Sequence, residues 1–85
     1  MDVQNLFEQA VTDSKNLAKK PGNATLLQLY ALYKQATQGD VNILMPGNMS
    51  DFVAKAKYNA WDEIKGKTRD EAMQQYITLV NSLKA

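Results

Sequence analysis

Residues 23–39 read NATLLQLYALYKQATQG and carry more apolar surface than one side of a helix can bury. At about 100° per residue, the apolar and aromatic side chains cover an arc of roughly 220° around the helix axis. A surface helix needs a stripe only about 100° wide. Asn23 favours a helix start and Gly39 a helix end. We therefore predict a helix that either packs between neighbours on two sides or presents part of its apolar face to a ligand.

Three further segments place apolar side chains three and four residues apart, which is the period of an amphipathic helix. They run from about 3 to 17, from Ser50 or Asp51 to Gly66, and from 68 to about 83. Asp2 suits the start of the first. Thr68 and Glu71 have the spacing of a capping box, in which each side chain accepts a hydrogen bond from the other residue's backbone N–H. No segment alternates as a β-strand does. The fold class is therefore predicted to be all-α, with four helices packed as a bundle.

The connection at residues 39–48 is longer than most loops, which predicts an overhand crossing instead of a tight turn. It contains three consecutive apolar residues, Ile43, Leu44 and Met45. These side chains either fold inward or form a small exposed patch that contacts a membrane or a partner enzyme. Inward packing is the favoured prediction.

The composition argues against several classes of function. The chain of 85 residues is expected to form one domain, 1–85, and its formal net charge of +1 argues against a nucleic-acid-binding protein. It has no histidine and no cysteine. The usual general base at neutral pH, the thiolate nucleophile and the soft metal ligands are therefore missing. We expect no enzyme activity, no metal and no cofactor.

The chain also lacks the features of targeting segments. Its first residues have neither the basic nor the apolar region of a signal peptide, and no apolar run approaches the ~20 residues of a membrane-spanning helix. The absence of cysteine gives no sign of an oxidising compartment. The protein is expected to be a cytoplasmic monomer without stable membrane insertion.

Two tyrosines and a lysine converge on one edge of the helix at residues 23–39. Lys34 lies one turn beyond Tyr30 and about 40° round the axis from it, and Tyr33 is on the same side. A phosphorylated aromatic nucleotide would suit this set, because a phenol ring can stack on a base and an ammonium can bind phosphate. Alternatively, the tyrosines are core residues and the lysine only extends to solvent. Helical periodicity alone favours this structural alternative.

The same residues belong to a longer pattern. It comprises Tyr30-x-x-Tyr33-Lys34-Gln35-Ala36-Thr37-x-Gly39-Asp40-x-Asn42, Pro46-Gly47, Asp51-Phe52, Lys55-Ala56-Lys57, Ala60-Trp61, Lys65-Gly66 and Glu71-Ala72-Met73-x-x-Tyr76-Ile77. The pattern extends from about Phe7 to Val80 and resembles the acyl-CoA-binding protein family. The resemblance implies an up-down-down-up four-helix bundle that holds one acyl-CoA in a groove.

The resemblance also implies roles for residues in all four helices. Tyr33 would stack on the adenine ring, while Tyr30, Lys34 and Lys57 would bind the ribose 3′-phosphate. Lys15 matches a lysine that contacts the phosphate region of the ligand, and Tyr76 matches a tyrosine that lines the site. The positions expected to face the acyl chain are Val11, Leu26 and Leu27.

The sequence departs from the family pattern at three places. Tyr58 stands where tryptophan is common, and residues 43–45 replace a more polar stretch. One extra residue lies between Pro46-Gly47 and Asp51-Phe52. The extra residue leaves the geometry of the loop open, whereas Tyr58 affects the packing of the groove and keeps an aromatic ring there.

The expected function is non-covalent binding, buffering and intracellular transport of medium- to long-chain acyl-CoA esters, with acyl-CoA-using enzymes as partners. Each buried CH₂ contributes about 0.8 kcal/mol, which favours long chains. The main alternative is a helical protein-interaction or regulatory module with vestigial ligand binding. Such a module would have lost some of Tyr30, Tyr33, Lys34 and Lys57, yet all four are present. A thioesterase or transferase would need a nucleophile and base pair, and the sequence offers none.

Overall fold

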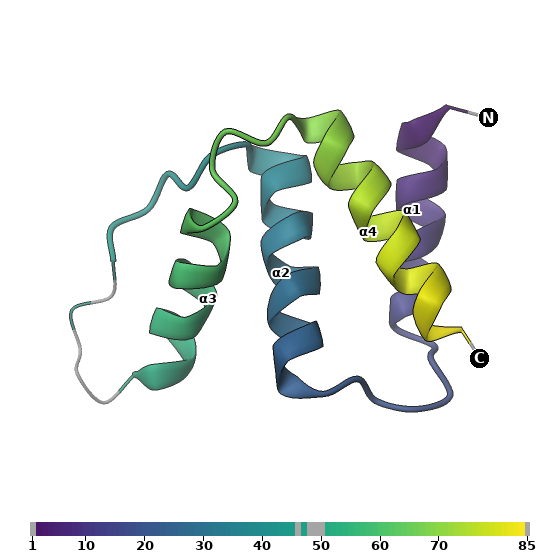
Figure 1. Ribbon diagram of the computed structural model, residues 1–85, viewed down its shortest axis with the longest axis horizontal. Coiled ribbons are helices and arrows are strands. Elements are labelled where there is room, and N and C mark those ends of the chain that lie inside the picture. The colour runs from purple at the N-terminus through teal and green to yellow at the C-terminus, as the bar shows by residue number, and fades with distance from the viewer. Residues whose placement is uncertain (1, 46, 48–50, 85) are drawn as a thin grey trace.

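The computed structural model describes residues 2–45, 47 and 51–84, whose helices form a flat bundle of 41 × 28 × 15 Å. The helices are α1 (Val3–Ser14), α2 (Asn23–Gln38), α3 (Phe52–Asp62) and α4 (Arg69–Leu83). Figure 1 shows that α1 and α4 run in one direction and α2 and α3 in the other. The predicted all-α fold with up-down-down-up topology is confirmed. Within the described ranges, no helix has the length and apolar character needed to cross a membrane.

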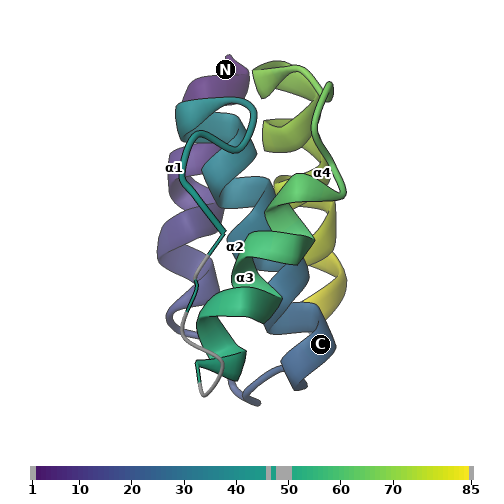
Figure 2. The ribbon, with the colours of Figure 1, turned by 90° about the vertical axis from the view of Figure 1, so that its left-hand side faces the viewer.

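α2 occupies the centre of the bundle. It packs on α4 and on α3, whereas α1 packs on α4. Figure 2 shows α3 in front of α2, with α1 and α4 behind it on either side. The wide apolar arc of α2 is explained in part by this position, because the helix is covered by two neighbours.

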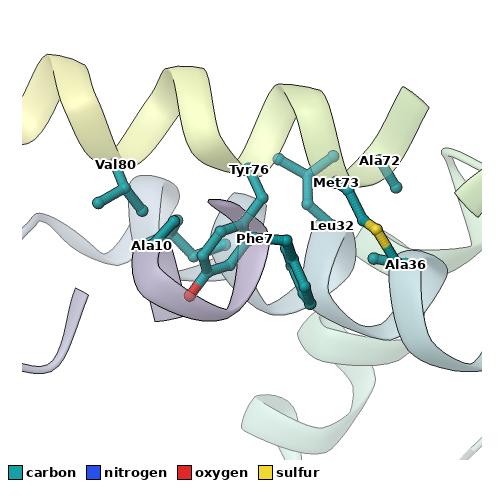
Figure 3. Packing of buried hydrophobic residues seen from close by; sticks show 9 residues of the cluster. Phe7, Ala10, Leu32, Ala36, Ala72, Met73, Tyr76 and Val80 are labelled. Carbon is teal, nitrogen blue, oxygen red and sulfur yellow. The ribbon is translucent and has the colours of Figure 1, made fainter. Parts of the chain in front are cut away.

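The hydrophobic core lies between α1, α2 and α4 (Figure 3). Ala72 and Val80 of α4 are completely buried, and Phe7 of α1 is 2% exposed. The Phe7 ring packs edge-to-face on Tyr76, with 5.2 Å between ring centroids. These contacts fix α1 and α4 against each other, and α2 packs on α4.

A buried glutamine joins α2 to α3 and to the turn before α4. The Gln35 side chain is 0% exposed, and its Nε2 donates to Asp40 Oδ1 and to the Lys67 carbonyl, each at 2.8 Å. Its Oε1 accepts from Trp61 Nε1 at 3.1 Å, and the Gly66 N–H donates to the same Asp40 oxygen at 2.7 Å. Among the described helices, α3 packs on α2 alone. This network, together with the buried indole of Trp61, therefore holds α3 in place.

Two helices end earlier than the sequence predicts. α1 ends at Ser14 instead of near Leu17, because the N–H groups of the next two residues donate to carbonyls only three residues back. α3 ends at Asp62, and turns lead from it to Gly66. Gly66 has a φ of +89°, in the left-handed region that glycine adopts without strain. The glycine therefore closes the turn and not the helix itself.

The predicted helix starts are confirmed at three helices. The side chains of Asp2, Asp51 and Thr68 each accept a hydrogen bond from the N–H three residues further on. The reciprocal bond from Thr68 N to Glu71 Oε1, at 3.2 Å, completes the capping box. α2 differs, because its N-cap is Gly22 and no side chain caps it. Ser50, the alternative cap of α3, lies outside the described residues, as does Pro46.

The prediction that Ile43, Leu44 and Met45 fold inward is wrong. Their side chains are 50%, 92% and 55% exposed. Figure 1 shows the reason: this connection passes on the outer side of α3, away from the core between α1, α2 and α4.

Candidate functional site

A cavity lies between α1 and α2, with α4 beneath it. In the described structure the backbones of α1 and α2 both lie close to α4 but not to each other, and the two helices meet through the rings of Phe7 and Tyr33. Space remains between them beside this contact. The cavity has a volume of about 430 Å³ and is lined by Val11, Ser14, Lys15, Leu26, Leu29, Tyr30, Tyr33, Lys57 and Tyr76. Seven of the nine site residues expected from the sequence are among these. Residues from four separate segments of the chain are thus brought together.

A second cavity, of about 440 Å³, lies between α2 and α3. It shares Leu26, Tyr30 and Lys57 with the first, so the two adjoin and form one groove. The rest of its lining is Asn23, Leu27, Phe52, Val53 and Ala56. The groove therefore has a basic and aromatic end between α1 and α2 and an apolar end between α2 and α3.

The expected acyl-chain residues divide between the two cavities. Val11 lines the first, Leu27 the second, and Leu26 both. The sequence interpretation missed Phe52 and Val53, which are 75% and 65% exposed at the start of α3. Two adjacent large apolar residues in the first turn of a helix were the available signal, because together they widen its apolar face beyond what Ala56 and Trp61 need for packing.

Two ammonium groups lie near the ring of Tyr30. Lys57 Nζ is 5.4 Å from the centre of the Tyr30 ring, and Lys34 Nζ is 6.0 Å from it. Lys34 Nζ also lies 5.5 Å from the ring centre of Trp61. In the part of the chain that the structure describes, the ion pairs involve other lysines. The two positive charges beside Tyr30 are therefore not neutralised by a described carboxylate, which makes this end of the groove attractive to an anion.

Lys34 is the expected ligand residue that lines neither cavity. Its ammonium group lies over the rings of Tyr30 and Trp61, and the residue as a whole is partly buried. Because a lysine side chain is long and mobile, contact with a ligand in the groove would need only a rotation past the Tyr30 ring.

Tyr33 presents an aromatic surface at the edge of the groove. Its side chain is 40% exposed and stacks on Phe7, with ring centroids 6.0 Å apart and an interplanar angle of 26°. The contact with Phe7 holds the ring in one orientation. The exposed remainder of the ring is suited to a flat group such as a nucleobase.

Tyr76 forms part of the floor of the groove. It is only 4% exposed, and its hydroxyl donates to Ser14 Oγ at 3.0 Å. Burial raises the pKa of the Tyr76 hydroxyl above its ordinary value, although the hydrogen bond with Ser14 opposes this. The phenol therefore stays protonated at neutral pH.

Known proteins resemble this chain along nearly its whole length. Residues 4–80 match the family model described as acyl CoA binding protein. The chain is 47% identical over 77 residues to the acyl-CoA-binding protein of Dictyostelium discoideum. The aligned residues are 91% of this chain and 90% of that protein. The crystal structure of acyl-CoA-binding protein 2 from Oryza sativa has a TM-score of 0.90 at 39% identity and covers 96% of this chain and 90% of that one.

The similar proteins include enzymes. Enoyl-CoA delta isomerase 2 of Rattus norvegicus is 46% identical over 83 residues, which are 98% of this chain but only 21% of the isomerase. This likeness therefore concerns a small part of that enzyme and does not extend to its activity. The matches that cover most of both chains agree with one another and with the fold. The chain belongs to the acyl-CoA-binding protein family.

Proposed function

We propose that this protein binds one medium- to long-chain acyl-CoA non-covalently in the groove, and that it buffers and transports this ligand. The proposal depends chiefly on one observation: Lys15, Tyr30, Tyr33, Lys57 and Tyr76 line a single cavity although they come from separate helical segments. Family membership supports it independently.

The nucleotide would bind at the basic and aromatic end of the groove. Tyr33 offers its exposed ring to the adenine, and the ammonium groups of Lys34 and Lys57 both lie near the ring of Tyr30, where the ribose 3′-phosphate would bind. Hydrogen bonds from ammonium groups to phosphate are charge-assisted and stronger than neutral ones. Lys15, at the edge of the same cavity, would contact the other phosphates.

The acyl chain would lie in the apolar cavity between α2 and α3. Leu26, Leu27, Phe52, Val53 and Ala56 supply its walls. The exposed faces of Phe52 and Val53 would become buried against the chain, and each buried CH₂ would contribute about 0.8 kcal/mol. Val11 lies in the other cavity, so we place it beside the linker between nucleotide and thioester.

We further propose that residues 1–85 act as a single acyl-CoA-binding domain, that the protein is a cytoplasmic monomer, and that acyl-CoA-using enzymes receive its ligand. The lack of cysteine supports the cytoplasmic location, and the near-neutral charge disfavours nucleic acid as a partner. Size-exclusion chromatography with light scattering tests the monomer directly.

Isothermal titration with palmitoyl-CoA, palmitate and free CoA tests the proposed function. We expect tight binding of palmitoyl-CoA at one site per chain and weak binding of the other two, because each of them fills only one end of the groove. Absence of heat with palmitoyl-CoA, confirmed by competition against a fluorescent acyl-CoA, would refute the proposal. Affinity for palmitate equal to that for palmitoyl-CoA would show that the nucleotide contributes nothing to binding.

A further inference from the structure

The hydroxyl of Ser14 lies at the end of α1 between a carbonyl and a phenol. It donates to the Val11 carbonyl at 2.7 Å and accepts from the Tyr76 hydroxyl at 3.0 Å. The Val11 carbonyl is one of the last in the helix, and the Lys15 N–H donates to Thr12 instead. Because a carbonyl can only accept, the Ser14 proton points to Val11. The Tyr76 proton must then point to Ser14.

This arrangement determines what Ser14 and Tyr76 can offer to a ligand. Both hydroxyl protons are used inside the protein, and the oxygens keep lone pairs. Both residues line the cavity between α1 and α2, beside Val11 and Leu29. A phosphate or carbonyl oxygen placed against these lone pairs would be repelled. A ligand group that carries an N–H or O–H would instead gain a hydrogen bond.

We propose that Ser14 is a positioning residue that turns Tyr76 into a hydrogen-bond acceptor for an amide N–H of the pantetheine arm of acyl-CoA. The inference rests on the proposed function. The pantetheine arm joins the nucleotide to the thioester and contains two secondary amides. The cavity of Ser14 and Tyr76 adjoins the apolar cavity through Leu26, so an acyl-CoA with its nucleotide beside Tyr33 must pass its arm through this region.

The test compares two ligands, palmitoyl-CoA and an analogue whose pantetheine amide nitrogens are methylated, on wild type and variants. We expect methylation to weaken binding to wild type roughly three- to tenfold, the range of one neutral hydrogen bond. Tyr76→Phe should bind both ligands with nearly equal affinity. Ser14→Ala should also lose the discrimination, because the phenol proton is then free to face the ligand. Ser14→Thr keeps the hydroxyl and should keep the wild-type ratio, a rescue that a purely structural role does not require.

The ratio of the two affinities separates the outcomes. The same methylation penalty in wild type, Tyr76→Phe and Ser14→Ala would overturn the proposal. A third ligand, palmitoyl-CoA without the pantoyl hydroxyl, distinguishes the donors: if Tyr76 discriminates only against this ligand, the amide assignment is wrong. Thermal melting shows whether each variant folds. If Ser14→Ala does not fold, the comparison of wild type with Tyr76→Phe still tests the proposal. Failure of wild type to bind palmitoyl-CoA would refute the proposed function itself. That result differs from one in which wild type binds palmitoyl-CoA and methylation weakens binding equally in wild type and variants.

Discussion

Replacement of Gln35 by leucine should loosen α3 more than the other helices. Leucine is apolar and of similar size, so the Lys67 carbonyl loses its side-chain donor and the Trp61 N–H keeps only the Gly39 carbonyl, at 2.9 Å. Two neutral hydrogen bonds at about 0.5–1.5 kcal/mol each amount to roughly 1–3 kcal/mol. The Asp40 carboxylate loses one donor but is exposed to solvent and keeps the Gly66 N–H, so this loss adds less than the other two.

A change of this size corresponds to an increase of about 5- to 150-fold in the equilibrium constant for opening of α3. Amide hydrogen exchange followed by NMR measures this opening residue by residue. The amides of α3 should exchange faster by that factor, whereas those of α1 and α4, which pack on each other, should change less. Affinity for palmitoyl-CoA should fall as well, because α3 carries Lys57 and Phe52 into the groove.

Gln38→Leu is the matched control, since Gln38 is exposed on the same helix. It should leave exchange in α3 unchanged. An equal acceleration in all four helices of Gln35→Leu would show that Gln35 supports the whole bundle and not the position of α3. No acceleration at all would show that the hydrogen bonds of Gln35 contribute nothing to holding the helix.

Three further outcomes test other parts of the structure. Lys34→Ala should weaken palmitoyl-CoA binding about 10- to 150-fold, the range for a hydrogen bond to a charged group, but should weaken binding of the 3′-dephospho analogue much less. Equal losses for the two ligands, or the same loss when the exposed Lys20 is replaced by alanine, would contradict the binding of the 3′-phosphate by Lys34. The Gly66 N–H and the Gln35 amide hold the pKa of Asp40 below its ordinary value of 3.8. The stability from Asp40 is thus complete above that value and is lost as the pH falls through the lowered pKa. The urea midpoint should therefore fall less steeply in Asp40→Asn than in wild type between about pH 5 and pH 2.5, and identical slopes would contradict this. Finally, two added CH₂ groups should tighten binding about 15-fold until the apolar cavity is full; a flat series from octanoyl- to palmitoyl-CoA would show that the chain stays outside it.

Local features of the fold could be predicted from the sequence. The capping box of Thr68 and Glu71 involves residues three apart, and its two hydrogen bonds form as soon as α4 does. The wide apolar arc of α2 indicated burial on two sides or a ligand, and the structure has two neighbours and a groove along this helix. The period of a helix and the residues that begin or end it depend on neighbours in the sequence, so both can be predicted from one amino-acid sequence.

Features that depend on distant partners could not be predicted in this way. Gln35 donates to Lys67, 32 residues away, and nothing in the local pattern marks it as more than a polar residue on a helix. The exposed positions of residues 43–45 follow from the path of the loop outside α3, which composition does not specify.

The candidate site shows the same division. Tyr30, Tyr33 and Lys34 could be placed on one helical edge from their spacing alone, but periodicity favoured a structural role for them. The family pattern supplied their proposed roles. Ser14 was missed because its place in the groove depends on the end of α1 and on Tyr76, 62 residues away.

Mapping of palmitoyl-CoA on the protein by ¹H–¹⁵N NMR tests the central claim most directly. We expect the largest shift changes in the last turn of α1, along the Leu26–Tyr33 face of α2, at residues 52–57 of α3, and at Tyr76. Residues Glu63, Gln75 and Leu79 line a separate cleft between α3 and α4 and should change little. Changes concentrated in that cleft, with the groove unaffected, would contradict the account.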